Sequence, residues 1–195
     1  MEIFKPFDIN YACDPVHFEP KDIVIRRNLE QIYDIFTEPD KALTILKKEN
    51  PVVVDVFMAP IPETIGHLMV VMTVVYPGKV GEEYYMTKGH IHSSDTAPEA
   101  YITLKGEGKL IMQTPDDDCF TGEIKVGKIN YIPSGWAHRS VNTGKEELIF
   151  LGIYPAESER DYSFIGKGRK NFLKIVIEKK GLPQVVDNPI SIGKD

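Results

Sequence analysis

The pattern of hydrophobic and polar positions changes once along the chain, near residue 50. Before that point, apolar residues recur at helical spacing over 29–36 and again over 42–46, which predicts two short helices. Thr37, followed three residues later by Asp40, resembles a capping box and is the predicted N-cap of the second helix. Three early prolines limit helix formation, so residues 1–27 are expected to be irregular.

After residue 50 the apolar segments become short, rich in β-branched and aromatic residues, and bounded by glycine and proline. This pattern predicts strands joined by turns, without the helix-sized gaps of βαβ units. Many strands at such spacing indicate a sandwich or a jelly-roll barrel, so the expected fold is dominated by β-structure. The predicted strands lie at 52–58, 67–76, 83–87, 99–105, 108–114, 121–126, 129–132, 138–142, 146–153 and 172–178.

A chain of 195 residues fits one domain, because all-β domains often reach this size. We expect an N-terminal extension with short helices over 1–50 and a β-barrel over 51–180. Residues 181–195 are expected to form a surface tail.

Composition narrows the classes of function. A net charge of -6 argues against a nucleic-acid surface. No apolar run approaches the length of a membrane span, and the N-terminus lacks the features of a signal peptide, so we expect a cytoplasmic protein. The two cysteines lie far apart and form no CxxC pair, so neither a zinc ribbon nor a redox dithiol is supported.

Two short stretches are typical of the two halves of one metal site. The first contains His90 and His92, followed by Glu99, and the second contains His138. Because side chains alternate along a strand, His90 and His92 are expected on the same face. With a carboxylate and a third histidine they could enclose one divalent ion, and this mixture of nitrogen and oxygen suits Fe, Ni, Zn or Mn.

These stretches resemble the two motifs of the cupin superfamily. Gly127-x5-Pro133-x-Gly135-x2-His138-x3-Asn142 matches the second motif, and His90-x-His92 with Glu99 and Gly106 resembles the first. The first departs in two places: six residues separate His92 from Glu99 where most cupins have three or four, and Tyr84 stands where a glycine is expected. The chain resembles the archaeal-type, metal-dependent glucose-6-phosphate isomerases over about residues 50–189. The resemblance is carried by the longer spacer and by the segments TKGHIH, LKGEG, QTP, WAHRSVN and IYPAE.

The resemblance implies a cupin jelly-roll barrel that interconverts glucose 6-phosphate and fructose 6-phosphate in glycolysis and gluconeogenesis, through a cis-enediol. It also implies one divalent transition metal per subunit, iron before Ni, Zn or Mn, and a homodimer that binds neither nucleic acid nor membrane. Residues 52–57 and the N-terminal segment are the candidate subunit interface. The implied metal ligands are His90, His92, Glu99 and His138.

The resemblance further implies roles around the substrate. Glu99 is the expected proton carrier, with Tyr101 as a hydroxyl partner on the same strand face. A metal-bound carboxylate is a weak base, so a hydride shift stays open beside proton transfer. Near Val54 the family pattern has a tyrosine, so that contact is either missing or supplied by another residue. The expected donors to the sugar phosphate are Thr73, Thr87, Gly89, Tyr154 and Tyr162.

Two other functions remain open at this point. The same ligands could hold iron in a cupin dioxygenase, which would have an apolar pocket. A non-enzymatic cupin could bind a sugar or a metal as a sensor, although no helix-turn-helix extension is visible. The native metal and the use of mannose 6-phosphate as a substrate are not determined by the sequence.

Overall fold

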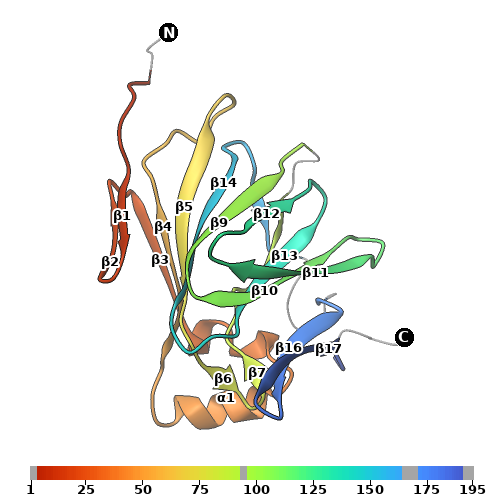
Figure 1. The fold of residues 1–195 in the computed structure, drawn as a ribbon. Helices are drawn as coiled ribbons and strands as arrows, with labels where there is room; N and C mark the ends of the chain where they lie inside the picture. The colour runs from red at the N-terminus through yellow and green to blue at the C-terminus, as the bar shows by residue number, and fades with distance from the viewer. Residues whose placement is uncertain (1–3, 93–95, 164–170, 191–195) are drawn as a thin grey trace.

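The computed structural model describes residues 4–92, 96–163 and 171–190, and it is dominated by β-strands. Two sheets form the body of the molecule (Figure 1). The larger sheet contains β3 (Ile23–Asn28), β4 (Val52–Met58), β5 (Leu68–Val75), β9 (Glu99–Lys105), β12 (Ile129–Ile132) and β14 (Leu148–Pro155), in the order β12-β9-β14-β5-β4-β3. The smaller sheet contains β10 (Glu107–Gln113), β11 (Cys119–Lys125) and β13 (Ala137–Asn142), in the order β11-β10-β13.

Small sheets and short helices surround this body. Near the N-terminus β1 pairs with β2, and beside the barrel mouth β8 pairs with β15. The C-terminal hairpin β16–β17 joins β6 and β7 in a four-stranded sheet. The bounds are β1 (Asn10–Cys13), β2 (Val16–Glu19), β6 (Lys79–Val80), β7 (Glu83–Tyr84), β8 (Ile91–His92), β15 (Arg160–Asp161), β16 (Lys174–Lys179) and β17 (Leu182–Asp187), with 3-10 helices η1 (Leu29–Gln31) and η2 (Tyr33–Ile35) and helix α1 (Pro39–Leu46).

The hydrophobic core lies between the two sheets. Val54 and Val75 from the larger sheet pack in one buried cluster with Leu110 and Val141 from the smaller sheet. All six residues of β13 are buried, so this strand has protein on both of its faces. The strand that carries His138 is therefore held on every side.

The β-rich jelly-roll architecture expected from the sequence is confirmed, with one difference. In the described part of the chain the sheets do not join into a single closed, hydrogen-bonded barrel. The segment that faces β13 on its open side pairs with it only at two isolated bridges, Met86–Val141 and His90–His138. Closure at this edge therefore depends on single residue pairs.

Three strands match the predicted bounds, at 52–58, 99–105 and 129–132. The prediction that residues 1–27 are irregular is wrong, because β1, β2 and β3 lie there. Pro15 and Pro20 stand between these strands, where no ladder hydrogen bond is lost. The expected tail also contains the strand β17, and residues 191–195 lie outside the described residues.

The first predicted helix has a different form, and the second has a different N-cap. The first is two 3-10 turns, because Ile32 between them leaves the helical region at φ −140° and ψ 10°. The second begins at Pro39 with Glu38 as its N-cap, so the prediction of Thr37 as N-cap is wrong. The backbone N–H and the hydroxyl of Thr37 instead donate to Oε2 of buried Glu83, at 2.8 and 2.9 Å.

The two candidate interface segments take different places in the larger sheet. Residues 52–57 belong to β4, which pairs with β5 on one side and β3 on the other. The N-terminal strand β3 is instead one edge of this sheet, with β12 at the opposite edge, and its Ile23 and Val24 are exposed. No helix among the described residues has the length and hydropathy needed to cross a membrane.

Candidate metal centre and active site

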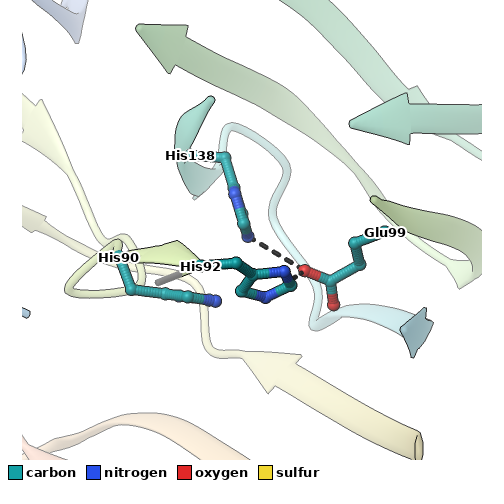
Figure 2. A group of neighbouring side chains, drawn as sticks. All are labelled: His90, His92, Glu99 and His138. Carbon is teal, nitrogen blue, oxygen red and sulfur yellow. Dashed lines mark ion pairs between the residues drawn. The ribbon is translucent and has the colours of Figure 1, made fainter. Parts of the chain in front are cut away.

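Four side chains predicted as ligands meet in one cluster. The candidate donor atoms of His90, His92, Glu99 and His138 all lie within 4.8 Å of one another (Figure 2). They come from β8 and the residue just before it, from the first residue of β9, and from β13. Residues up to 48 positions apart in the sequence are thus brought to one point by the fold.

Backbone pairing places two of these histidines side by side. The N–H of His90 donates to the carbonyl of His138 at 3.2 Å, and the N–H of His138 donates to the carbonyl of His90 at 2.9 Å. The two rings are 4.3 Å apart between centroids. On its other side β13 pairs with β10, which fixes His138 opposite Met112.

The rings of His92 and His138 are oriented by the hydrogen bonds that their Nδ1 atoms make. Nδ1 of His92 lies 3.0 Å from the carbonyl oxygen of Ala97, and Nδ1 of His138 lies 3.1 Å from that of Trp136. A carbonyl can only accept, so each Nδ1 carries the proton and donates. Each Nε2 is then a free lone pair directed into the cluster, which is the tautomer that binds metals.

The cluster leaves its central polar atoms unsatisfied. Nε2 of all three histidines and Oε2 of Glu99 are buried without a hydrogen-bond partner in the described structure. Nε2 of His138 lies 3.0 Å and Nε2 of His92 3.5 Å from Oε2 of Glu99, but neither contact has hydrogen-bond geometry. Such orphaned atoms are costly in a protein interior. A divalent transition metal would satisfy all four, so the residues fit the ion that the sequence predicted.

Burial keeps His90 and His92 neutral. Loss of solvent lowers the pKa of His90 well below its ordinary value, and repulsion from His138 and Arg160 lowers it further. Burial also lowers the pKa of His92, although the charge of Glu99 acts in the opposite direction. Neutral imidazole is the form that ligates a metal, so the site is ready for an ion near neutral pH.

A cavity opens beside the cluster and has three kinds of lining. His90 and Glu99 form its metal-facing end. Hydroxyl and backbone groups are contributed by Thr73, Thr87, Gly89, Tyr101 and Tyr162, and an apolar wall by Val54, Val56, Val71 and Phe150. The third group is cationic, namely Arg27, Lys88 and Arg160.

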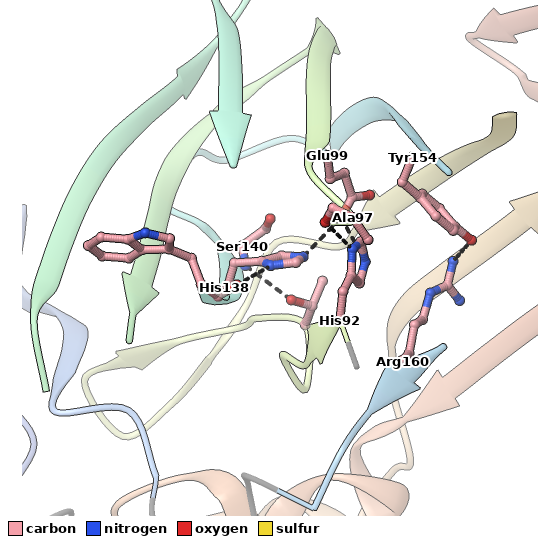
Figure 3. A network of polar contacts seen from close by, with 9 residues as sticks. His92, Ala97, Glu99, His138, Ser140, Tyr154 and Arg160 are labelled. Atoms are coloured by element: carbon pink, nitrogen blue, oxygen red, sulfur yellow. Dashed lines mark hydrogen bonds and ion pairs between the residues drawn. The ribbon is translucent and has the colours of Figure 1, made fainter. Parts of the chain in front are cut away.

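The predicted tyrosines take different places. Tyr101 lines the cavity with its ring 5.9 Å from that of His138, and burial together with the charge of Glu99 raises its pKa well above the ordinary value. Tyr154 stands 5.3 Å from His92, and its hydroxyl accepts a hydrogen bond from Nη2 of Arg160 at 2.5 Å (Figure 3). Burial raises the pKa of Tyr154 to about 12 despite that arginine. Both phenols therefore stay protonated at neutral pH.

Two cationic residues of the cavity were missed by sequence reasoning. Arg27 comes from β3, a strand that the prolines concealed, and Arg160 from the two-residue strand β15. Val54, where the family pattern has a tyrosine, lies directly opposite Arg27 in the β3–β4 register. Neighbouring residues of a strand point to opposite faces, so Arg26 and Arg27 could have been assigned to different faces of the sheet. That inference required residues 23–28 to be recognised as a strand first.

Comparison with solved structures finds partial similarity to an oxalate decarboxylase and an oxalate oxidase. Oxalate decarboxylase from Bacillus subtilis is 20% identical with a TM-score of 0.43, covering 53% of this chain and 25% of that one. Oxalate oxidase in complex with glycolate is 18% identical with a TM-score of 0.43, covering 51% of this chain and 49% of that one.

Comparison at the level of sequence is more extensive. The family model described as Glucose-6-phosphate isomerase (GPI) matches residues 60–190. The glucose-6-phosphate isomerase of Pyrococcus furiosus is 43% identical over 185 residues, 95% of this chain and 96% of that protein. That of Thermococcus kodakarensis is 44% identical over 189 residues, 97% of this chain and 98% of that protein. With its cluster of three histidines and one glutamate at the mouth of a jelly roll, the chain belongs to the archaeal, cupin-type glucose-6-phosphate isomerase family.

Proposed function

We propose that this protein interconverts glucose 6-phosphate and fructose 6-phosphate with one divalent transition metal per subunit. The observation that carries the proposal is the set of four unsatisfied, clustered donor atoms at the end of a cavity with hydroxyl and cationic groups. Relatives 38–44% identical over most of their length are named glucose-6-phosphate isomerase, which supports the same reaction here.

His90, His92, Glu99 and His138 would hold the ion, which supplies Lewis-acid polarisation of the substrate carbonyl when bound. The mixture of nitrogen and oxygen donors suits Fe, Ni, Zn or Mn, and among these we favour iron.

We assign different tasks to the two oxygens of the Glu99 carboxylate. Oε2 faces the three histidines, whereas Oε1 points away from them toward β14 (Figure 2). Gly152 on β14 leaves room for Oε1, since a Cβ at that position would lie 2.7 Å from it. In this proposal Oε2 serves as a ligand and Oε1 carries the proton, and the surrounding protein would have to offset the lower basicity of a metal-bound carboxylate.

The proton steps follow from this arrangement. With the aldose open, Glu99 takes the proton from C2 while O1 gains a proton, and the product is a cis-enediol. Return of the proton to C1 and loss of the proton on O2 then give the ketose. Tyr101 lines the same cavity as a protonated phenol, so we assign it as the hydroxyl partner of the substrate oxygens.

The substrate-binding residues remain those that the resemblance implied. Thr73, Thr87, Gly89 and Tyr162 line the cavity and can bind the sugar phosphate. The Thr87 hydroxyl accepts a hydrogen bond from the N–H of Ser140 at 3.0 Å, which leaves its own proton for the substrate. Tyr154 is held beside His92 by Arg160, so we assign its hydroxyl to the sugar end of the substrate.

The decisive experiment is an anaerobic assay of the metal-loaded protein with fructose 6-phosphate. Formation of glucose 6-phosphate without oxygen or nucleotide is expected. A dioxygenase cannot turn over under these conditions, and a sensor would bind without converting. Absence of product with every one of the four metals would overturn the proposal.

We further propose a homodimer. The edge strand β3 exposes Ile23 and Val24, at 41% and 48%, beside its unpaired backbone groups. An apolar edge of this kind favours pairing with a second copy.

A further inference from the structure

Two cations converge on one aromatic ring at the cavity. The guanidinium carbon of Arg27 lies 5.5 Å from the ring centroid of Tyr162, and Nζ of Lys88 lies 5.4 Å from the same centroid. Nη2 of Arg27 is also 3.5 Å from the Tyr162 hydroxyl, at the limit of a hydrogen bond. All three side chains line the cavity, and each is only partly buried.

These two cations lack the partners that other basic residues have. Among the described residues, no carboxylate lies within ion-pair distance of Arg27 or Lys88. The neighbouring Arg26 differs, because it points to the opposite face of β3 and binds buried Asp55 through two hydrogen bonds of 2.8 and 2.7 Å. Arg26 therefore forms a structural ion pair, whereas Arg27 faces the cavity.

The position of Arg27 is set by the sheet. It lies directly opposite Val54 in the β3–β4 register, and cross-strand neighbours project from the same face. Val54 is apolar and lines the cavity wall, so it offers nothing to an anion. The segment Thr87–Lys88–Gly89 brings a hydroxyl and a second cation to the lining of the same cavity.

We propose that Arg27, together with Lys88, binds the phosphate group of the substrate beside the ring of Tyr162. This inference rests on the proposed function and adds the charged part of the phosphate site to the neutral donors assigned above. Two unpaired cations near one another repel, and a dianion between them removes that repulsion. A guanidinium can also bind phosphate through two parallel hydrogen bonds, which neither a valine nor a tyrosine at position 54 could match.

The cations of the cavity fall into two groups, one near the metal-facing end and one beside Tyr162. Arg160, the third cation of the cavity, donates a hydrogen bond to the hydroxyl of Tyr154, whose ring stands beside His92, so it lies toward the metal-facing end. Arg27 and Lys88 instead share Tyr162, and their loss should affect substrate affinity more than turnover. This difference between KM and kcat is one that a merely structural role would not produce.

The test compares R27M, R27K and K88M with the wild type. The KM for fructose 6-phosphate is expected to rise about 10- to 100-fold in R27M, the usual range for a lost hydrogen bond between charged groups, with kcat changed only a few-fold. R27K should give an intermediate KM, because lysine keeps the charge and loses the planar fork. Lys47→Met is the matched control, since Lys47 is an exposed lysine at the end of α1, and its KM should equal that of the wild type.

A second measurement does not depend on activity. Inorganic phosphate is titrated into the metal-loaded proteins while the thermal midpoint is followed, and it should raise the midpoint of the wild type and of K47M but not that of R27M. A KM within twofold of wild type in R27M, or equal protection of R27M and wild type by phosphate, would overturn the inference. If the wild type shows no isomerase activity, the proposed function fails, and the phosphate titration still decides whether Arg27 binds the anion.

Discussion

Replacement of Asn142 by alanine should destabilise the fold without emptying the metal site. Asn142 ends β13 and is fully buried. Its Nδ2 donates to the carbonyls of Val75 and Glu146, at 2.8 Å each, and its Oδ1 accepts from the N–H of Gly144 at 2.9 Å. One amide thus joins β5, β13 and the turn that follows β13.

The magnitude follows from these three bonds. Each contributes about 1 kcal/mol net, and unsatisfied buried partners add to the loss, so Asn142→Ala should lower the free energy of unfolding by about 3 to 5 kcal/mol. For a chain of this size, 3 kcal/mol corresponds to a fall of about 6 to 12 °C in Tm. Asn142→Asp should be at least as damaging, because a carboxylate cannot donate to two carbonyls.

The assay is urea unfolding of the metal-loaded protein, followed by circular dichroism, with metal content measured in parallel. Asn10→Ala is the matched control, because Asn10 is exposed on β1, and it should change stability by less than about 0.5 kcal/mol. A loss of less than about 1 kcal/mol in Asn142→Ala, on the scale of a single such bond, would refute the reasoning. Loss of metal at unchanged stability would assign Asn142 to the metal site instead.

The remaining predictions concern the metal, the proton and the assembly. Chelation should abolish isomerase activity, and Fe, Ni, Mn or Zn should restore it to different degrees; full activity in a rigorously metal-free preparation would contradict the proposal. His138→Ala should lose bound metal, measured by atomic emission, and its rate should fall by more than the roughly 10- to 100-fold typical of outer-shell changes. Glu99→Gln should lower kcat by about 10²- to 10⁴-fold if Glu99 carries the proton. Near-native kcat with metal retained would favour a hydride shift, and solvent deuterium at the transferred position distinguishes the two routes if metal is lost. Light scattering should report a dimer, and a monomer at working concentration would contradict the interface proposed at β3.

The sequence predicted the strands best where alternation and turn residues agreed. Residues 52–58 and 99–105 are bounded by clear breaks and carry β-branched residues, and both strands have the predicted bounds. The strands before residue 30 were not predicted because prolines were read as a sign of irregular chain. In the fold those prolines stand between strands, and β3 is stabilised by pairing with β4, a contact between distant residues that no local pattern reveals.

The clustering of His90, His92, Glu99 and His138 could be predicted because the two motifs constrain spacing as well as residue type. Arg27 and Arg160 could not, because an arginine on a strand carries no local mark of the cavity that it faces. The contact of Thr37 could not be predicted from local sequence either. Its hydroxyl donates a hydrogen bond to Glu83, 46 residues away, instead of capping the next helix. Local rules fail where a buried charge needs a partner from elsewhere in the chain.

The carbonyls of Ala97 and Trp136, which accept from the histidine rings, have a consequence for the choice of metal. They hold the rings of His92 and His138 against rotation before any ion arrives, so little side-chain entropy is lost when one binds. A receptor that is already ordered gains affinity for each ion whose geometry fits it, and the three imidazoles and one carboxylate are donors that Fe, Ni, Zn and Mn all accept. Occupancy should then follow the Irving–Williams series and the supply of each metal during expression, so preparations from different growth media should contain different ions in the same four-residue cage.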